Sequence, residues 1–377
     1  MIGSVRVSLG ALRHNASALA EMVGPQAAAF VVKSNAYGHG LVETALAVEG
    51  FASRLCVYAV DEAIALRDGG VTKPILILGP VPPEELDRAH AAKVEISLWD
   101  THGFLRRVQV AGGKRHRPFP VHVKINTGLN RLGLNPEDLA DSVENLLQFP
   151  EIEIAGIFSH LASAEELDSP YTLHQLDVFN RAYGQCAPTL AAQGLRPLRH
   201  LAASAAAMLW PQTRLDFSRF GIALYGLWPS AQTREAMGSH GIALEPALSY
   251  RSVVVVERTV PAGEPIGYGN SFHAPRDLRV GVVPCGYADG VPRALSNRGA
   301  FLVDGARCPI VGRVAMNVTE VDLSAAPGAH AGSTVTLIGR DGEEEVTADE
   351  WATWCDTINY EIVARLPAEL PREYVET

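Results

Sequence analysis

Short apolar segments of strand length alternate with segments of helical periodicity over residues 28–226. The apolar segments are nearly continuous, which is typical of strands buried on both faces of a parallel sheet. The eight predicted strands are AAFVVK (28–33), LCVYAV (55–60), ILILGP (75–80), VEISLW (94–99), FPVHVKI (119–125), IEIAGIF (152–158), LRHLA (198–202) and FGIALYG (220–226). The clearest helical segments between them are LVETALAVE (41–49), VDEAIALRD (60–68), LADSVENLL (139–147) and HQLDVFNRAYGQ (174–185).

Eight strands that alternate with helices favour a parallel (β/α)8 TIM barrel, which we expect over residues 1–237. The count leaves a doubly wound sheet open, because that fold also alternates strands and helices. After residue 238 the pattern changes to strands divided by Gly, Pro and Asp turns, which predicts a second, mostly β domain over 238–377. The opening segment VRVSL is a candidate strand of that second domain. Its other predicted strands are YRSVVVVERTV (250–260), LRVGVVPCG (278–286), AFLVDG (300–305), CPIVGRVAM (308–316) and STVTLIG (333–339).

Composition narrows the range of partners. The 377 residues carry a formal net charge of −10, so most of the surface would repel nucleic acid. The five cysteines are scattered and never spaced as CxxC, which indicates a reducing compartment without a disulfide framework or zinc site. No apolar run is long enough to span a membrane, and the amino terminus lacks the apolar core of a signal peptide. We therefore expect a cytoplasmic protein without a membrane partner.

Candidate chemistry begins at the end of the first predicted strand. The segment FVVKSNAYGHG (30–40) places Lys33 where an apolar strand ends. The carboxyl ends of barrel strands carry function, and a partly desolvated lysine amine is suited to Schiff-base chemistry because its pKa falls. A solvated lysine at a strand end is the alternative that position alone leaves open. Signatures of dinucleotide, nucleoside triphosphate, zinc-protease and EF-hand calcium sites are absent from the sequence.

The segment VVKSNAYGHG resembles the cofactor-lysine signature of alanine racemases, and the resemblance continues in order along almost the whole chain. It implies that Lys33 joins pyridoxal 5'-phosphate covalently, and that Lys33 and Tyr268 are the two catalytic bases that interconvert L- and D-alanine. It further implies a homodimer in which Tyr268 acts in the partner's site, and a role in supplying D-alanine for peptidoglycan. The matching segments are VHVKINTGLNRLG (121–133), GIFSHLAS (156–163), RFGIALYG (219–226), GEPIGYGNSF (263–272), GYADGVPR (286–293), CPIVGRVAMN (308–317) and INYE (358–361).

The resemblance also assigns binding roles. Besides Lys33, the residues implied to bind the cofactor phosphate are Tyr37, Ser204, Gly221, Ile222 and Tyr360. Those implied to bind the rest of the cofactor are Arg131 at its phenolic oxygen, Arg219 at its pyridine nitrogen and His160 against its ring. Arg131 and the amide of Met316 are implied to bind the substrate carboxylate. The residues implied to lie at the entrance are Tyr287, Arg293 and Arg313. Some family members carboxylate the lysine that corresponds to Lys124. Taken singly, each of these residues could equally be a packing or salt-bridge residue, and their order along the chain is what favours the functional interpretation.

The sequence departs from the common family pattern at four positions. Ala203 and Asn126 replace a frequent asparagine and a usual aspartate, while Ala315 and Asn317 flank Met316 where cysteine and aspartate are common. These changes bear on the choice of substrate more than on the cofactor, so a serine or broad-specificity racemase stays open.

Two other classes of protein also use a barrel that binds pyridoxal phosphate. A decarboxylase with the same barrel should bind its substrate through a cysteine and acidic residues of the β domain. This chain has Tyr268 and the Met316 segment there instead. A non-enzymatic cofactor carrier would lack the second domain. Both alternatives fit the sequence less well than a racemase does.

Overall fold

The computed structural model describes residues 3–101, 103 and 118–376. The chain divides into two compact units. We call them the barrel unit (residues 11–34 and 41–245) and the β unit (residues 1–10, 35–40 and 246–377). The domain boundary expected after residue 237 falls inside a helix, and the division between the units follows Glu245.

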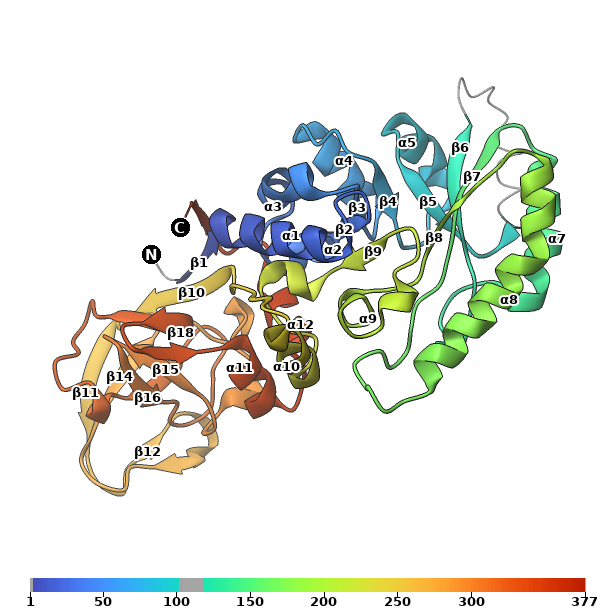
Figure 1. Cartoon of the computed structure of the whole chain (residues 1–377). Helices are drawn as coiled ribbons and strands as arrows, with labels where there is room; N and C mark the ends of the chain where they lie inside the picture. The colour runs from blue at the N-terminus through green and yellow to red at the C-terminus, as the bar shows by residue number, and fades with distance from the viewer. Residues whose placement is uncertain (1–2, 102, 104–117, 377) are drawn as a thin grey trace. The chain divides into compact units, whose positions relative to one another are not determined.

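The barrel unit is built on one sheet of eight parallel strands, which confirms the predicted α/β barrel (Figure 1). The strands pair in the order β8-β7-β6-β5-β4-β3-β2-β9. Their bounds are β2 (Ala28–Val31), β3 (Arg54–Val57), β4 (Ile75–Ile77), β5 (Glu95–Leu98), β6 (Phe119–Lys124), β7 (Ile152–Phe158), β8 (Leu198–His200) and β9 (Ser218–Phe220). The helices of this part of the chain are α1 (Leu9–Val23), α3 (Leu41–Val48), α4 (Val60–Asp68), α5 (Leu86–Ala91), α7 (Leu139–Leu147), α8 (Tyr171–Ala192), α9 (Ser204–Leu209) and α10 (Ala231–Ser239).

The two ends of this strand order meet and close the sheet. A parallel bridge joins Ala203, just after β8, to Arg219 in β9. The Arg219 amide donates a hydrogen bond of 3.0 Å to the carbonyl of Ala202. Every residue of β2, β3 and β4 is buried, in agreement with the continuous apolar character of their sequences.

One predicted strand is wrong for most of its length. The segment 220–226 contributes only Phe220 to β9 and then forms a 3-10 turn over Ile222–Tyr225. All four residues of the turn are buried, and Gly226 ends it with a left-handed φ of 79°. A buried turn and a buried strand are both apolar throughout, so periodicity could not separate them.

The β unit contains a seven-stranded sheet, a three-stranded sheet and a two-stranded hairpin. The largest sheet follows the order β16-β15-β18-β10-β1-β20, with β19 paired to β18. The strands of the β unit are β1 (Gly3–Ser8), β10 (Leu248–Val253), β11 (Val256–Val260), β12 (Pro265–Ile266), β13 (Phe272–His273), β14 (Leu278–Val283), β15 (Ala300–Val303), β16 (Ala306–Pro309), β17 (Thr319–Asp322), β18 (Thr334–Asp341), β19 (Glu344–Val346) and β20 (Arg372–Val375). Two helices, α11 (Ala348–Cys355) and α12 (Asn359–Ala364), accompany them.

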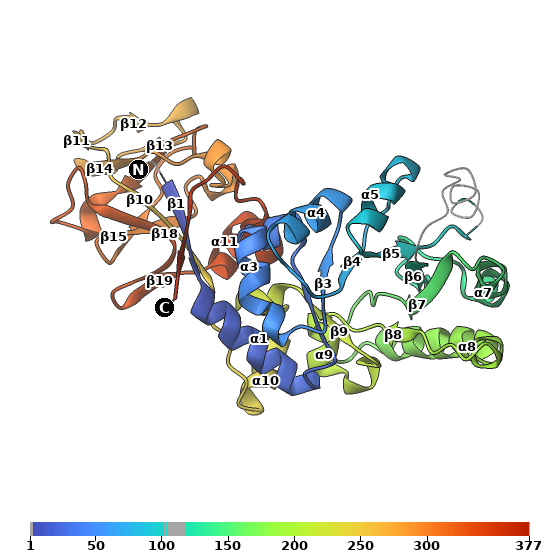
Figure 2. The ribbon, with the colours of Figure 1, turned by 90° about the horizontal axis from the view of Figure 1, so that it is seen from above.

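The opening segment of the chain is a strand of the β unit. Strand β1 pairs antiparallel with β10 and parallel with β20, so the first strand and the last lie side by side (Figure 2). The predicted strand 250–260 is two strands, because the chain passes from one sheet to another at Val254 and Val255. The Val254 amide bonds to Ser333 beside β18, whereas the Val255 amide bonds to Val282 in β14.

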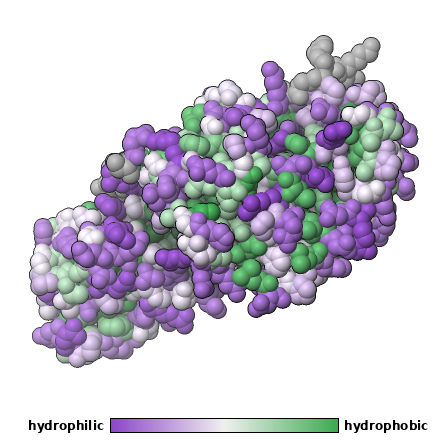
Figure 3. All heavy atoms as spheres, in the orientation of Figure 1, coloured by the Kyte–Doolittle hydropathy of each residue, from purple (hydrophilic) through white to green (hydrophobic). Residues whose placement is uncertain are grey.

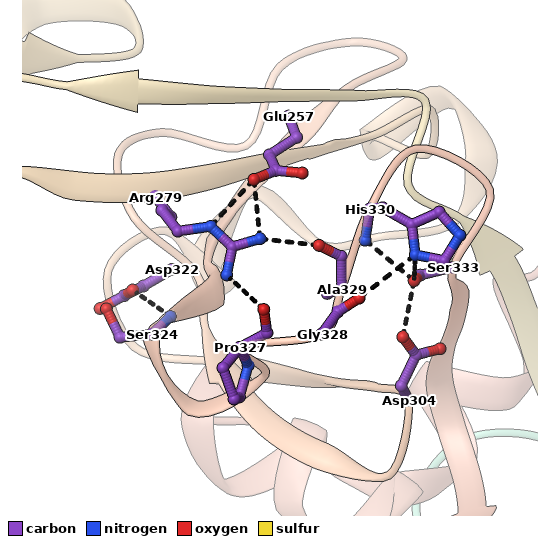
Figure 4. A network of polar contacts seen from close by, with 10 residues as sticks. All are labelled: Glu257, Arg279, Asp304, Asp322, Ser324, Pro327, Gly328, Ala329, His330 and Ser333. Carbon is purple, nitrogen blue, oxygen red and sulfur yellow. Dashed lines mark hydrogen bonds and ion pairs between the residues drawn. The ribbon is translucent and has the colours of Figure 1, made fainter.

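A network of polar side chains fixes the loop between β17 and β18 (Figure 4). Arg279 binds Glu257 on the neighbouring strand and also donates to the carbonyls of Pro327 and Ala329 in the loop. Ser333 donates its hydroxyl proton to Asp304 at 2.6 Å. Nδ1 of His330 lies 3.3 Å from the same hydroxyl and 3.2 Å from the carbonyl oxygen of Gly328, so the histidine ring also belongs to the network (Figure 4).

Polar and apolar side chains are mixed on the surface of the described residues (Figure 3). Hydrophilic side chains are spread over the face in Figure 3, with apolar side chains lying among them. Within the described residues no helix is both long and apolar enough to cross a membrane. All five cysteines are free thiols.

Candidate active site

Lys33 lies two residues after the end of β2, on the side of the sheet where the barrel strands have their carboxyl ends. Burial lowers the pKa of its amine, and the charge of Arg131 lowers the pKa further, while Glu62 acts in the opposite sense. The amine nitrogen lies 5.7 Å from the centre of the Tyr58 ring. Glu62 also accepts a hydrogen bond of 2.6 Å from the amide of Ser34. The lysine is thus held at the barrel mouth in the partly desolvated surroundings that nucleophilic amines require.

The short helix α2 (Lys33–Tyr37) that follows β2 has an unusual hand. Ser34, Asn35, Ala36 and Tyr37 all have φ between 52° and 55°, which is the left-handed region. Non-glycine residues visit this region singly and seldom in succession, because Cβ then approaches the next carbonyl oxygen. The residues after the candidate cofactor lysine therefore carry backbone strain, as functional segments often do.

Four cations interact at the barrel mouth. Burial is the main cause that lowers the pKa of Lys124 to about 8, and the charges of Arg219, Arg131 and Lys33 add to it. Lys124 is the last residue of β6, and its ammonium lies 5.5 Å from the centre of the Phe158 ring. A chain with a net charge of −10 thus concentrates positive charge at one place. Such a cluster suits a ligand that carries several negative charges.

Arg219 and His160 are in contact at the same mouth. Arg219 is buried, and its guanidinium donates to the carbonyls of Ser159 at 2.9 Å and Leu201 at 3.0 Å. The same guanidinium nitrogen lies 3.3 Å from Nδ1 of His160. Since arginine only donates, this histidine nitrogen accepts. Burial first, and then the charge of Arg219, lower the pKa of His160 to about 3. His160 is therefore neutral at physiological pH.

Two of the groups expected at the cofactor phosphate, the Ser204 hydroxyl and the Gly221 amide, meet beside the barrel closure. The amide of Gly221 donates a hydrogen bond of 3.1 Å to the hydroxyl of Ser204, so the two groups are adjacent. Ser204 opens α9, and Ile222 opens the 3-10 turn after β9. A cavity of about 230 Å³ reaches from Arg131 and His160 to the start of α9. Hydroxyl and backbone N–H groups of this kind are ordinary ligands of phosphate oxygens.

Ala203 precedes α9 as its N-cap residue and makes no side-chain cap there. Asparagine at this position could accept a hydrogen bond from a free amide of the first turn, which alanine cannot do. Asn126, unlike Ala203, can make the hydrogen bonds of the residue it replaces. Its side-chain oxygen accepts from the amides of Gly128 and Asn130 at 3.2 and 2.9 Å. It therefore shapes the loop that carries Arg131 as an aspartate would.

The two tyrosines expected at the phosphate lie together in the β unit. The rings of Tyr37 and Tyr360 are 6.3 Å apart and tilted by 49°. The tight packing around them depends on Gly38, where a Cβ would lie 2.1 Å from the carbonyl oxygen of Val363. Segments far apart in the sequence are in this way joined around the tyrosine pair.

Tyr268 lies in a glycine turn of the β unit with 72% of its surface exposed. Gly267 and Gly269 on either side have φ of 73° and 71°, which glycine adopts without strain. A Cβ at Gly269 would lie 2.9 Å from the guanidinium of Arg313, so the turn rests against that side chain. The phenol is therefore presented outward on a constrained turn.

The segment around Met316 is fastened to the turn that carries Tyr287. The amides of Tyr287 and Ala288 donate to the carbonyls of Ala315 and Met316 at 3.0 and 2.8 Å. Asn317 adds a hydrogen bond of 3.1 Å from its side chain to a carboxylate oxygen of Asp289. A neutral asparagine can donate here, whereas an ionised aspartate would repel Asp289.

Met316 and Tyr287 remain 57% and 45% exposed. Tyr287 and Arg293 line one cavity of about 490 Å³ in the β unit, which also contains Arg365 and Glu361. The candidate residues thus form two groups. Those of the barrel unit are Lys33, Lys124, Arg131, His160, Ser204, Arg219, Gly221 and Ile222. Those of the β unit are Tyr37, Tyr268, Tyr287, Arg293, Arg313, Met316 and Tyr360.

Sequence reasoning missed the polar residues beneath the barrel mouth. Glu62 and Tyr58 approach Lys33, and His200 lies 2.6 Å from the guanidinium of Arg219. A weak signal was available, because His122 and His200 interrupt otherwise apolar strands. Polar residues in such strands have to find partners inside the barrel.

The donor set at the barrel mouth fits pyridoxal phosphate. The cofactor carries a phosphate and a phenolic oxygen, and the mouth offers four mutually repelling cations, a serine hydroxyl and a glycine amide. Lys33 would hold the aldehyde, Ser204 and the amides of Gly221 and Ile222 the phosphate, and Arg219 the pyridine nitrogen. Among the described residues no group of three or more His, Cys, Asp and Glu side chains could hold a metal ion.

Comparisons with known proteins cover nearly the whole chain. Residues 7–229 match the family model "Alanine racemase, N-terminal domain", and residues 247–374 match "Alanine racemase, C-terminal domain". An alanine racemase of Symbiobacterium thermophilum is 38% identical over 371 residues, which are 98% of this chain and 96% of that protein. One from a Nostoc species is 36% identical over 373 residues, covering 98% of this chain and 94% of the relative.

Solved structures agree with these matches. Alanine racemase from Bacillus anthracis with bound L-Ala-P has a TM-score of 0.90 at 32% identity and covers 99% of this chain and 95% of its own. The enzyme from E. faecalis has a TM-score of 0.90 at 34% identity, covering 99% of this chain and 98% of its own. With both family models matched, and full-length relatives well above 30% identity, the chain is a racemase that belongs to the alanine racemase family.

Proposed function

We propose that this chain interconverts L-alanine and D-alanine with pyridoxal 5'-phosphate bound at Lys33. The observation that carries the proposal is the Lys33 amine, whose pKa is lowered by burial and by Arg131, at the carboxyl end of β2. The names of the relatives support alanine as the substrate. Bound at Lys33, the cofactor would supply an electron sink that stabilises the negative charge left on the substrate Cα.

Racemisation requires one proton acceptor on each face of the substrate Cα. From D-alanine, Lys33 would take the Cα proton while Tyr268 gives a proton to the other face. From L-alanine, Tyr268 would take the proton while Lys33 gives one to its own face. Arg131 and the amide of Met316 would bind the substrate carboxylate and so fix which faces the bases meet. The departures at Ala203, Ala315 and Asn317 keep serine as the second candidate substrate.

We also propose that the active enzyme is a homodimer in which Tyr268 acts in the partner's site. The support is the 72% exposure of the Tyr268 side chain on its glycine turn, together with the 57% exposure of Met316. A tyrosine and a methionine so exposed in one chain are suited to burial by a second copy. Arg293, Arg313 and Tyr287 would then line the entrance.

A complementation experiment tests the shared site directly. Lys33→Ala and Tyr268→Phe should each be inactive alone, because each lacks one base. After the two variants are mixed and their subunits exchanged, half of the dimers carry one complete site, so about a quarter of wild-type activity should return. No recovery in a mixture shown to contain hybrid dimers would place both bases in one chain.

The reaction and the cofactor have separate tests. Circular dichroism should follow the loss of optical activity from L-alanine and D-alanine, with L-serine as the competing substrate, with and without added cofactor. After borohydride reduction, mass spectrometry should find a pyridoxyl group on Lys33 in the peptide containing SNAYGHG. An unmodified peptide would rule out the proposed cofactor linkage. We further propose a cytoplasmic enzyme that supplies D-alanine for peptidoglycan, which predicts that cells lacking it require added D-alanine.

A further inference from the structure

A chain of polar side chains crosses the interior of the barrel below Arg219. From Arg219, Nη1 lies 2.6 Å from Nδ1 of His200. Nε2 of His200 lies 2.9 Å from Nδ1 of His122, and Nε2 of His122 lies 3.1 Å from Oε2 of Glu95. The same Glu95 oxygen accepts a hydrogen bond from Arg54. Barrel interiors are normally filled with branched apolar residues, so a continuous polar chain here calls for an explanation.

The surroundings hold the two imidazole rings in place. Both histidines are fully buried. The ring of His200 is stacked between Phe158 at 4.5 Å and Phe217 at 4.1 Å. His122 fits because Gly156 faces it, where a Cβ would lie 2.1 Å from its Nδ1. Neither ring can therefore turn over without a rearrangement of the core.

The direction of every proton in the chain follows from its two ends. Arginine only donates, so Nδ1 of His200 must be a bare acceptor and its proton must sit on Nε2. That proton points to Nδ1 of His122, which must in turn accept and carry its own proton on Nε2. The chain ends on a carboxylate, which only accepts when ionised. Both histidines are thus neutral and share the Nε2–H tautomer.

Charge and burial agree with this assignment. Burial lowers the pKa of both histidines below the ordinary value, which keeps the rings neutral. Burial alone would raise the pKa of Glu95, but its hydrogen bonds and charge contacts with His122 and Arg54 outweigh this and lower it. The pKa of Arg219 is lowered by burial to about 10, so this side chain still carries its proton at neutral pH.

We propose that Glu95 is a positioning residue, which sets the tautomers of His122 and His200 and thereby presents a lone pair to Arg219 at the barrel mouth. Without a carboxylate at the far end, the Nε2 proton of His122 would be buried without an acceptor, so the reversed arrangement with both protons on Nδ1 would compete with the one that Arg219 favours. In His200 that proton would face the guanidinium, and two donors in contact would push Arg219 out of place. The predicted effect on turnover rests on the proposed function, whereas the predicted tautomers follow from the polar chain alone.

The test uses ligand-free protein labelled with ¹⁵N in its histidine rings. In the unchanged protein, two histidines should show a protonated Nε2 and a bare Nδ1 at neutral pH. Glu95→Gln keeps an acceptor oxygen and should keep both tautomers. Glu95→Ala removes the acceptor, so the same two histidines should populate the Nδ1–H form. An Nδ1–H or doubly protonated His200 in the unchanged protein would overturn the proposal, as would tautomers that survive in Glu95→Ala.

Gly156→Ala provides a second route if Glu95→Ala does not fold. Its methyl group should displace His122 while Glu95 and Arg54 stay in place, so the tautomer of His200 should change. A His200 tautomer unaffected by this substitution would contradict the relay. With cofactor and alanine, Glu95→Ala should lower kcat by about tenfold more than Glu95→Gln, as expected for one misplaced charged donor. An inactive parent protein with the expected tautomers would refute the proposed function and leave the relay standing.

Discussion

Replacing Ser34 by glycine is expected to stabilise the ligand-free protein, the reverse of what this change does in an ordinary helix. Ser34 is exposed, and its φ of 55° lies in the left-handed region. Removing Cβ there should relieve about 1–2 kcal/mol of strain. The greater freedom of glycine in the unfolded chain offsets about 0.5–1 kcal/mol of this gain. The hydrogen bond from the residue 34 amide to Glu62 is kept, because it belongs to the backbone.

Ser17→Gly in α1 is the matched control. Ser17 lies inside α1 and its hydroxyl donates to Glu21 at 3.0 Å. Glycine at an ordinary helical position should destabilise by about 0.5–1 kcal/mol, and loss of the hydrogen bond adds to this. Urea unfolding of the two variants should therefore move the midpoint in opposite directions. A fall in both midpoints by similar amounts would refute the assignment of left-handed strain at Ser34.

Three further predictions concern the site. In deuterium oxide, Tyr268→Phe should retain Cα exchange of D-alanine and lose that of L-alanine by about 10²–10⁴-fold, whereas its racemisation falls equally in both directions because the two enantiomers are equally stable. Lys124, with a pKa of about 8, should lose its proton between pH 7 and 9 and then bind ¹³C-labelled carbon dioxide as a carbamate detectable by NMR. Ala203→Asn should cap α9 and raise the free energy of unfolding by about 1 kcal/mol.

Each of these outcomes has a counterpart that would contradict it. Equal exchange of both enantiomers by Tyr268→Phe would remove this tyrosine as the base for L-alanine. The same carbamate signal in Lys124→Arg, whose side chain stays protonated, would assign the signal to another amine. A denaturation midpoint unchanged in Ala203→Asn would mean that the first turn of α9 already has partners for its amides.

Regular elements of the barrel unit were predicted well where the buried residues recur with the period of the element, as Leu139, Val143 and Leu146 do in α7. Helices α4 and α7 begin and end at the predicted residues, and β7 spans the predicted 152–158. The prediction failed where tertiary contacts decide the backbone. Of the apolar run 308–316 only Cys308 and Pro309 belong to a strand, β16, and Gly312 then turns the chain with a φ of 86° against the carbonyl of Ile266. A contact of that kind leaves no periodic trace in the sequence.

The candidate site was predictable only in part, for a related reason. Lys33 stands out because a charged residue directly follows an apolar strand. Glu95, His122 and His200 act through one another across three strands of the barrel, and their spacing along the chain reflects only the lengths of the intervening helices. Barrel register, not local sequence, brings such side chains together. They could be noticed as polar interruptions of apolar strands, but their order and direction required the structure.

The positive charges at the barrel mouth act on one another and are only partly opposed by the carboxylates near them. Besides burial, these charges lower several pKa values because little water screens them. Arg131 lowers the pKa of Lys33, and Arg219, Arg131 and Lys33 lower that of Lys124. All four cations lower the pKa of His160. Glu62 opposes this effect at Lys33, and Glu95 lies at the far end of the relay, so neither carboxylate neutralises the centre of the cluster. An anionic ligand would therefore be attracted strongly and held without a preformed counter-charge to displace. Under the proposed function, the burial and the Arg131 charge that lower the pKa of Lys33 would also make its amine a better nucleophile, so one electrostatic arrangement would serve both capture and covalent attachment of the cofactor.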